Sequence, residues 1–157
     1  MRGATVIAVD TDDVKLKIAQ QLGANFIINS KNTDLHQKLQ EITNGDGPNV
    51  VIEAAGNPAT YRTAIEEVAF AGRVVCIGYA GTEVSFSTKL WVQKELEIMG
   101  SRNANPSDFE AVIKYLKSGQ VDENILISKT VSPADAPVAM KEWSEAPGRI
   151  MKILVQF

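Results

Sequence analysis

Four apolar runs without polar alternation recur in the first half of the chain. They are residues 5–9, 26–28, 50–52 and 74–77, and segments with helical spacing lie between them. Continuous hydrophobicity is typical of strands in parallel sheets, because both faces of such sheets are covered. Strands and helices that alternate over such short stretches of sequence predict right-handed βαβ units. We therefore expect an α/β fold with a doubly wound (Rossmann-like), mostly parallel sheet.

The helical segments carry the residues that begin and end helices. Asn57 followed by Pro58 predicts an N-cap and a first helical position, with the helix ending at Gly72. An earlier helix is capped by Thr33 or Asp34 and ends at residues 44–45, where Asn-Gly favours a left-handed C-terminus. These boundaries support the alternating pattern independently of hydrophobicity.

The second half of the chain predicts further, less regular elements. Short strands are expected at residues 83–87, 96–100 and 125–127, and a final strand at 152–155. Helices are expected at residues 106–117 and from Asp135 onward. The first of these two helices should bury an apolar face made of Phe109, Val112, Ile113 and Leu116. No linker, repeat or low-complexity tract interrupts the pattern, so residues 1–157 are expected to form a single domain.

Composition and charge exclude several classes of function. A net charge of -3 provides no basic footprint for nucleic acid or an anionic membrane. No apolar run approaches the roughly 20 residues of a transmembrane helix. A lone cysteine, Cys76, forms no internal disulfide and fits a reducing cytoplasm, and its apolar strand predicts a packed thiol rather than a nucleophile. With His36 as the single histidine, the chain cannot supply the ligands of a usual zinc site or a histidine proton relay.

Asp10 ends the apolar strand at residues 6–10. In a dinucleotide-binding sheet, an acid at the end of the second strand accepts hydrogen bonds from the adenosine ribose hydroxyls and repels a 2′-phosphate. The alternative is that Asp10 merely caps the following helix. A glycine-rich phosphate turn should lie roughly 20 residues before that acid. Only nine residues precede Asp10, so the first strand and its turn are expected to be absent.

Six segments stand in a recognisable order and at matching separations. They are residues 3–10 (GATVIAVD), 19–24 (AQQLGA), 49–56 (NVVIEAAG), 71–79 (AGRVVCIGY), 94–101 (KELEIMGS) and 148–157 (GRIMKILVQF). Together they resemble the cofactor domain of the medium-chain dehydrogenase/reductase family, in its zinc-dependent alcohol and polyol branch. The resemblance implies hydride transfer between a secondary alcohol and NAD, with zinc polarising the oxygen. It also implies that the catalytic domain and the zinc ligands lie outside this chain, so no catalytic residue is assigned and the isolated chain is expected to be inactive.

The resemblance assigns cofactor-binding roles residue by residue. Asp10 and Lys15 match residues at the adenosine ribose, and Ala54, Ala55 and Gly56 match a strand end that passes along both riboses. Ile77, Gly78 and Tyr79 match the backbone that binds the nicotinamide carboxamide, with Gly100, Ser101 and Arg102 in the next loop of the same pocket. Lys152 resembles a basic residue near the pyrophosphate. Each glycine also has a plain structural reading, because tight turns after strands need glycine.

The resemblance further implies a homodimer and leaves alternatives open. In the family, the subunit contact extends the sheet of one protomer into the next, and residues 84–86 and 98–101 match that edge. One alternative is the zinc-free quinone or enoyl reductase branch, which prefers NADPH and which Asp10 argues against. Another is a non-catalytic nucleotide-sensing or dimerisation module that functions at this length.

Overall fold

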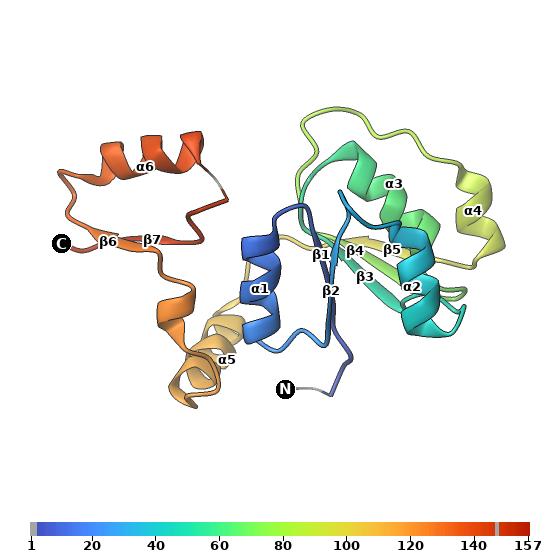
Figure 1. Ribbon diagram of the computed structural model, residues 1–157, viewed down its shortest axis with the longest axis horizontal. Helices are drawn as coiled ribbons and strands as arrows, with labels where there is room; N and C mark the ends of the chain where they lie inside the picture. Colours follow the sequence, from blue (N-terminus) through green and yellow to red (C-terminus); the bar gives the residue numbers. More distant parts are fainter. Residues whose placement is uncertain (1–2, 147) are drawn as a thin grey trace. The chain divides into compact units, whose positions relative to one another are not determined.

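Strands and helices alternate along the chain in the computed structural model, which describes residues 3–146 and 148–157 (Figure 1). The strands are β1 (Ile7–Asp10), β2 (Phe26–Asn29), β3 (Val50–Glu53), β4 (Arg73–Cys76), β5 (Glu97–Gly100), β6 (Lys129–Val131) and β7 (Ile153–Val155). The helices are α1 (Asp13–Gln21), α2 (Leu35–Thr43), α3 (Pro58–Glu67), α4 (Thr88–Gln93), α5 (Pro106–Lys117) and α6 (Ala136–Glu145), with a 3₁₀ turn at Glu123–Ile125.

The strands pair in parallel. β1 pairs with β2, β3 with β4, β4 with β5, and β6 with β7, giving separate sheets of two, three and two strands. Each pair in sequence order is connected through a helix, as parallel neighbours require. The predicted α/β class with parallel strands is confirmed.

The chain divides into two compact units. Asp34–Asn103 forms one unit, which holds α2, β3, α3, β4, α4 and β5. The other unit combines the segment up to Thr33 with Ala104–Phe157, and so holds β1, α1, β2, α5, β6, α6 and β7. The single domain expected from the sequence stays a prediction.

Local capping chemistry explains where the helices begin. Asp34 accepts the Gln37 N–H at 3.0 Å, and Asn57 accepts the Ala59 N–H at 2.8 Å, with Pro58 at the first helical position. Asn44 ends α2 in the left-handed conformation at φ 55°. These boundaries are confirmed. α3, however, ends at Glu67 rather than Gly72, because the backbone turns extended at Val68 (φ -62°, ψ 143°).

The core of the Asp34–Asn103 unit lies between α3 and one face of its sheet. Its buried members are Ala64, Ile65, Val68, Val74 and Leu96, and Val51, Cys76, Leu90 and Ile98 pack against them. The expectation that both faces of every strand are covered is wrong for β3. Val50 is 51% exposed and Ile52 is 63% exposed, because they alternate with the inward-facing Val51 and Glu53 and so lie on the opposite face.

Three other sequence expectations are wrong. Residues 83–87 form no strand, because they join no ladder among the described residues, and Ser87 instead caps α4. Residues 125–127 form no strand either: the Ile125 N–H donates to the Asp122 carbonyl in a 3₁₀ turn, and pairing starts at Lys129. The apolar side chains of α5 are exposed, from 36% at Leu116 to 61% at Phe109.

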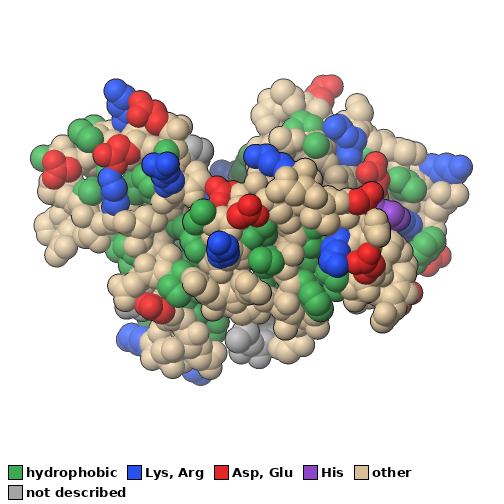
Figure 2. All heavy atoms as spheres, in the orientation of Figure 1, with side chains coloured by type: hydrophobic (Ala, Val, Ile, Leu, Met, Phe, Trp, Pro, Cys, Tyr) green, Lys and Arg blue, Asp and Glu red, His purple; other side chains and the backbone are tan. Residues whose placement is uncertain are grey.

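The surface is therefore mixed in character. Figure 2 shows hydrophobic side chains among scattered charges of both signs on the visible face.

α5 itself forms where the sequence predicts it, because the Asn105–Asp108 capping box and Pro106 define its first turn locally. None of the described helices combines the length and the apolar character that crossing a bilayer requires.

Candidate nucleotide-binding site

The first candidate pocket lies at the carboxyl end of β1. It is an open hollow of about 520 Å³ that Asp10, Asp12, Asp13, Lys15, Lys31 and Gly148 help to line. The carboxyl ends of parallel strands are where nucleotide sites of open α/β sheets are found. The structure thus places Asp10 and Lys15, which the sequence assigned to one ribose, beside the same hollow.

Asp10 and Asp12 have different roles at the start of α1. Asp12 is the N-cap and accepts the Val14 N–H at 2.8 Å, so the alternative that Asp10 caps this helix is wrong. One oxygen of Asp10, Oδ1, accepts the Thr11 N–H at 2.7 Å and the Asp12 N–H at 3.0 Å. The other oxygen, Oδ2, accepts no hydrogen bond from the residues that the structure describes. A fixed carboxylate with one free oxygen is suited to a hydroxyl donor.

The second candidate pocket lies after β4 and β5, within the Asp34–Asn103 unit. It is a hollow of about 340 Å³ lined by Ile77, Tyr79, Ser101, Arg102 and Asn103. Four of these five residues, all except Asn103, were assigned to one pocket by the sequence. The Ser101 N–H donates to the Cys76 carbonyl at 2.9 Å, which aligns the loops after the two strands.

Two glycines bring the turns after β3 and β4 into direct contact. A Cβ at Gly56 would lie 2.5 Å from the Tyr79 carbonyl oxygen, and one at Gly78 would overlap the Gly56 nitrogen. Gly56 also has a positive φ of 68°, which favours glycine. The structural reading of both glycines therefore holds, and it also places Gly56 beside the loop that lines the second pocket.

The backbone of residues 77–79 leaves two acceptors and one donor free. The Ile77 and Gly78 N–H groups donate to the Glu53 carbonyl at 2.9 and 3.0 Å, and the Tyr61 hydroxyl donates to the Gly78 carbonyl at 2.5 Å. The Ile77 carbonyl, the Tyr79 N–H and the Tyr79 carbonyl have no hydrogen-bond partner in the described part of the chain. An acceptor next to a donor is complementary to a primary carboxamide, which offers an N–H and a carbonyl.

The remaining residues assigned from the sequence are less constrained. Ala54 and Ala55 are exposed beside Gly56, and Ser101 and Arg102 are exposed at the rim of the second hollow. Gly100 ends β5, where a Cβ would meet nothing within 4 Å. Lys152 is exposed just before β7 and lines neither hollow. Its proposed place at a pyrophosphate stays a prediction.

The titratable groups behind the second pocket keep their protons. Burial, followed by the nearby Glu53 carboxylate, raises the pKa of the Cys76 thiol, although a hydrogen bond with Tyr61 opposes the effect. Desolvation, together with Cys76 and Glu53, also raises the pKa of the Tyr61 hydroxyl. A protonated thiol is a poor nucleophile, which agrees with the prediction that Cys76 packs against the core.

The residues present do not fit a zinc site. No group of three or more His, Cys, Asp or Glu side chains within residues 3–146 and 148–157 could hold a metal ion. Zinc in proteins takes three protein ligands at a catalytic site or four at a structural one. The described residues therefore supply neither kind of site.

Comparison with known proteins identifies the family. The sequence matches the family described as zinc-binding dehydrogenase over residues 1–118. This chain belongs to the zinc-binding dehydrogenase family. The part of the chain that holds both hollows, apart from Gly148, lies within the matched residues.

Relatives of this chain include an alcohol dehydrogenase-like protein and a polyol dehydrogenase. A zinc-type alcohol dehydrogenase-like protein of Haemophilus influenzae is 31% identical over 99% of this chain and 45% of its own length. A sorbitol dehydrogenase of Halalkalibacterium halodurans is 27% identical over 98% of the chain and 45% of its length. The chain thus spans less than half the length of the curated relatives it matches.

Solved structures of relatives share the fold of this chain. An alcohol dehydrogenase from Escherichia coli CFT073, solved with NADH, superimposes with a TM-score of 0.86 and 29% identity, covering 98% of this chain and 44% of the other. An Escherichia coli oxidoreductase of unknown specificity gives a TM-score of 0.89 at 26% identity, covering 99% and 45%. The fold is therefore that of the cofactor-binding Rossmann domain of these enzymes.

Sequence reasoning assigned no role to several residues that shape the two hollows. Among them, Lys31 and Gly148 line the first and Asn103 lines the second, and Lys31 and Asn103 lie outside the six segments of the family resemblance. Another is Glu53, a carboxylate at the end of β3 that is only 3% exposed. An acid inside the apolar stretch NVVIEAAG was the available signal, because charged residues are seldom buried without a partner.

Proposed function

We propose that this chain is the NAD-binding part of a zinc-type alcohol or polyol dehydrogenase, which transfers hydride between a secondary alcohol and NAD. The observation that carries the proposal is the free Oδ2 atom of Asp10 at the end of β1, beside a hollow of about 520 Å³. A carboxylate there accepts a ribose hydroxyl and repels a 2′-phosphate, so it favours NAD over NADP. The relative solved with NADH supports the choice of cofactor.

In this proposal each hollow, taken by itself, is complementary to a different group of the nucleotide. Asp10 and Lys15 bind the adenosine ribose, while the Ile77 carbonyl and the Tyr79 N–H hold the nicotinamide carboxamide. Bound NAD supplies the hydride acceptor. The residues of this chain bind and orient NAD. The rest of the intact protein binds the alcohol and supplies the zinc ligands and the proton relay. We propose that it also contains the first strand and the glycine-rich turn of the doubly wound sheet.

Nucleotide titration of the isotope-labelled chain tests the binding part of the proposal. NAD should shift the amide signals of Asp10, Thr11 and Tyr79, and NADP should shift those near Asp10 much less. Binding should be weak, because no glycine-rich turn holds the pyrophosphate at a helix N-terminus. Equal responses to NAD and NADP around Asp10 would contradict the assignment.

A turnover assay tests whether this chain catalyses alcohol oxidation by itself. We expect the purified chain to oxidise no secondary alcohol with NAD, whether or not zinc is added, because it holds one histidine and one cysteine. NAD-dependent turnover that zinc stimulates would show that this chain is catalytic by itself. A nucleotide-sensing module would also bind nucleotide without turnover. Alcohol oxidation by the protein encoded in the complete reading frame would then favour the dehydrogenase over the sensing module.

A further inference from the structure

The carboxylate of Glu53 is buried under the turn that follows β3. Its Oε1 atom accepts three hydrogen bonds: from the Ala55 N–H at 3.0 Å, from the Gly56 N–H at 2.9 Å and from the Thr60 hydroxyl at 2.6 Å. The side chain thus fixes the turn to the first helical turn of α3. Hydrogen bonds to a charged acceptor are stronger and more directional than neutral ones.

The main chain of Glu53 holds the neighbouring turn at the same time. Its carbonyl accepts the N–H groups of Ile77 and Gly78, and the Tyr61 hydroxyl, next to Thr60 on α3, binds the Gly78 carbonyl. One residue therefore links the turn after β3 to the loop after β4. That loop carries the free Ile77 carbonyl and the free Tyr79 N–H.

The second carboxylate oxygen of Glu53 lies against the same loop. Oε2 is buried and has no hydrogen-bond partner among the described residues, and a Cβ at Gly78 would come within 2.6 Å of it. Burying a charged oxygen without a partner is costly, and an apolar side chain in this place would avoid that cost. The arrangement instead places negative charge directly behind residues 77–79.

We propose that Glu53 is the positioning residue of the nicotinamide pocket, and that it makes the pocket selective for a carboxamide over a carboxylate. The Gly78 N–H that donates to the Glu53 carbonyl shares a planar peptide with the Ile77 carbonyl and so sets its direction, while the Tyr61 hydroxyl on the Gly78 carbonyl sets that of the Tyr79 N–H. The Ile77 carbonyl then requires a donor from the ligand, which a carboxamide supplies and a carboxylate lacks. The buried negative charge opposes a second negative charge at the same place. The inference rests on the proposed function, because it assumes that the nicotinamide end of NAD occupies the second hollow.

The test compares two mononucleotides that differ only in this group. Nicotinamide mononucleotide and nicotinic acid mononucleotide are titrated separately into the full labelled chain, and the dissociation constants are taken from the shifts of the Tyr79 and Ser101 amides. The unaltered chain should prefer the carboxamide about tenfold. Glu53→Gln and Thr60→Val should reduce that preference to about threefold or less, because they remove the charge or loosen its fixed orientation.

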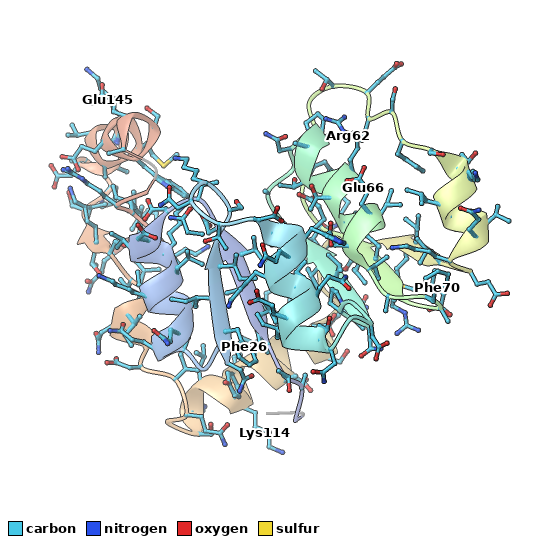
Figure 3. All side chains as sticks on the ribbon, turned by 45° about the vertical axis from the view of Figure 1, so that its right-hand side comes forward. Phe26, Arg62, Glu66, Phe70, Lys114 and Glu145 are labelled. Carbon is cyan, nitrogen blue, oxygen red and sulfur yellow. The ribbon has the colours of Figure 1, made fainter. Side chains whose placement is uncertain are left out.

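Two further variants separate positioning from general stability. Thr60→Ser retains the hydroxyl that donates to Glu53 and should keep the full preference. Arg62→Ala alters an exposed side chain on α3, the helix that also carries Thr60, and should also keep it (Figure 3). If Glu53→Gln fails to fold, the Thr60→Val and Thr60→Ser pair still decides the question.

The outcomes distinguish the inference from the function on which it rests. If Thr60→Val and Glu53→Gln weaken both mononucleotides equally and leave the preference intact, Glu53 has only a structural role and the inference is overturned. If the unaltered chain shifts no signal in the second hollow with either mononucleotide, the proposed function fails as well. Loss of preference in the two variants, with retention in Thr60→Ser, supports the inference.

Discussion

Asp10 and Asp12 are joined by a hydrogen bond of 3.0 Å from the Asp12 N–H to Asp10 Oδ1. Because Asp12 in turn caps α1, the carboxylate of Asp10 is held by the same backbone turn that starts the helix. The free Oδ2 atom therefore has a fixed position at the hollow before any ligand arrives. A preorganised acceptor of this kind loses little side-chain entropy on binding.

Replacing Asp10 by serine should weaken binding of adenosine monophosphate to the chain. We expect a loss of about tenfold, which corresponds to about 1.4 kcal/mol, since one charged acceptor for the ribose is removed. The affinity for adenosine with a 2′-phosphate should fall less or rise, because charge repulsion also disappears. Calorimetry or amide shifts give both constants. Asp46→Ser, at an exposed position outside the hollow, is the control, and an unchanged ratio of the two affinities would refute the role of Asp10.

The free edge of β5 is the proposed homodimer contact. β5 is the outer strand of the β3-β4-β5 sheet, and its Glu97 N–H and the Ser101 N–H just after it point toward β4, so the Gly100 N–H faces away. Gly100→Pro should therefore shift the chain from dimer to monomer in sedimentation at micromolar concentration. Gly100→Ala keeps the N–H, adds a Cβ that meets nothing within 4 Å, and should remain dimeric. Identical sedimentation of both variants and the unaltered chain would exclude this edge.

Residues 84–86 are the second segment of the proposed contact. The sequence matched them to the same subunit edge, but they form no strand in the described structure. Phe86 is 38% exposed and its ring lies 6.5 Å from the Trp91 ring, centroid to centroid. Phe86→Pro should therefore change sedimentation less than Gly100→Pro, and an equal or larger change would contradict a main contact on β5.

The raised pKa of Cys76 predicts a pH-dependent stability. Burial first, and Glu53 second, favour the protonated thiol in the folded chain, so the unfolded chain ionises at a lower pH, near 8.5. The folded state then binds more protons in that interval, and stability falls as pH rises from the unfolded pKa through the folded one. Urea unfolding at pH 7.5 and 9.5 should show this fall, and Cys76→Ala should reduce it. An equal fall in stability in the Cys76→Ala variant would show that titratable groups other than the Cys76 thiol cause it.

Truncating one side chain in the core between α3 and its sheet should strongly lower the stability of the fold. Ile65 is 3% exposed among Val68, Val74 and Leu96, so Ile65→Ala should lower the free energy of unfolding by about 2–5 kcal/mol. Val92→Ala, at a side chain 77% exposed, should change it by less than about 0.5 kcal/mol. Urea unfolding can be followed by Trp91 fluorescence in a Trp143→Phe background. Comparable losses in the two variants would show that this core is not a cooperative unit.

The features that the sequence predicted well are those determined by neighbouring residues. Asp34 and Asn57 cap helices through side-chain bonds to the next few N–H groups, and Asn44 ends one through its own backbone preference. Asp10 was found for a similar reason, because its position at a strand end is visible in the chain. Local chemistry of this kind needs no knowledge of distant contacts.

The features that the sequence could not predict depend on distant partners. Residues 83–87 have a β-like composition, but a strand needs a ladder and they have none among the described residues. The apolar stripe of α5 was assigned to a core, yet Phe109 is 61% exposed. Glu53 was overlooked because its importance comes from contacts with residues 77 and 78, more than twenty positions away.

The division of the chain has a consequence for its biosynthesis. Asp34–Asn103 is continuous, whereas the other unit needs its first segment and the segment that begins at Ala104. A ribosome adds about 5–20 residues each second, so the continuous unit can close while the later segment is still being made. β1, α1 and β2 must meanwhile remain without the later segment that completes their unit. Nascent chains halted shortly after residue 103 should therefore be the ones that most need a chaperone.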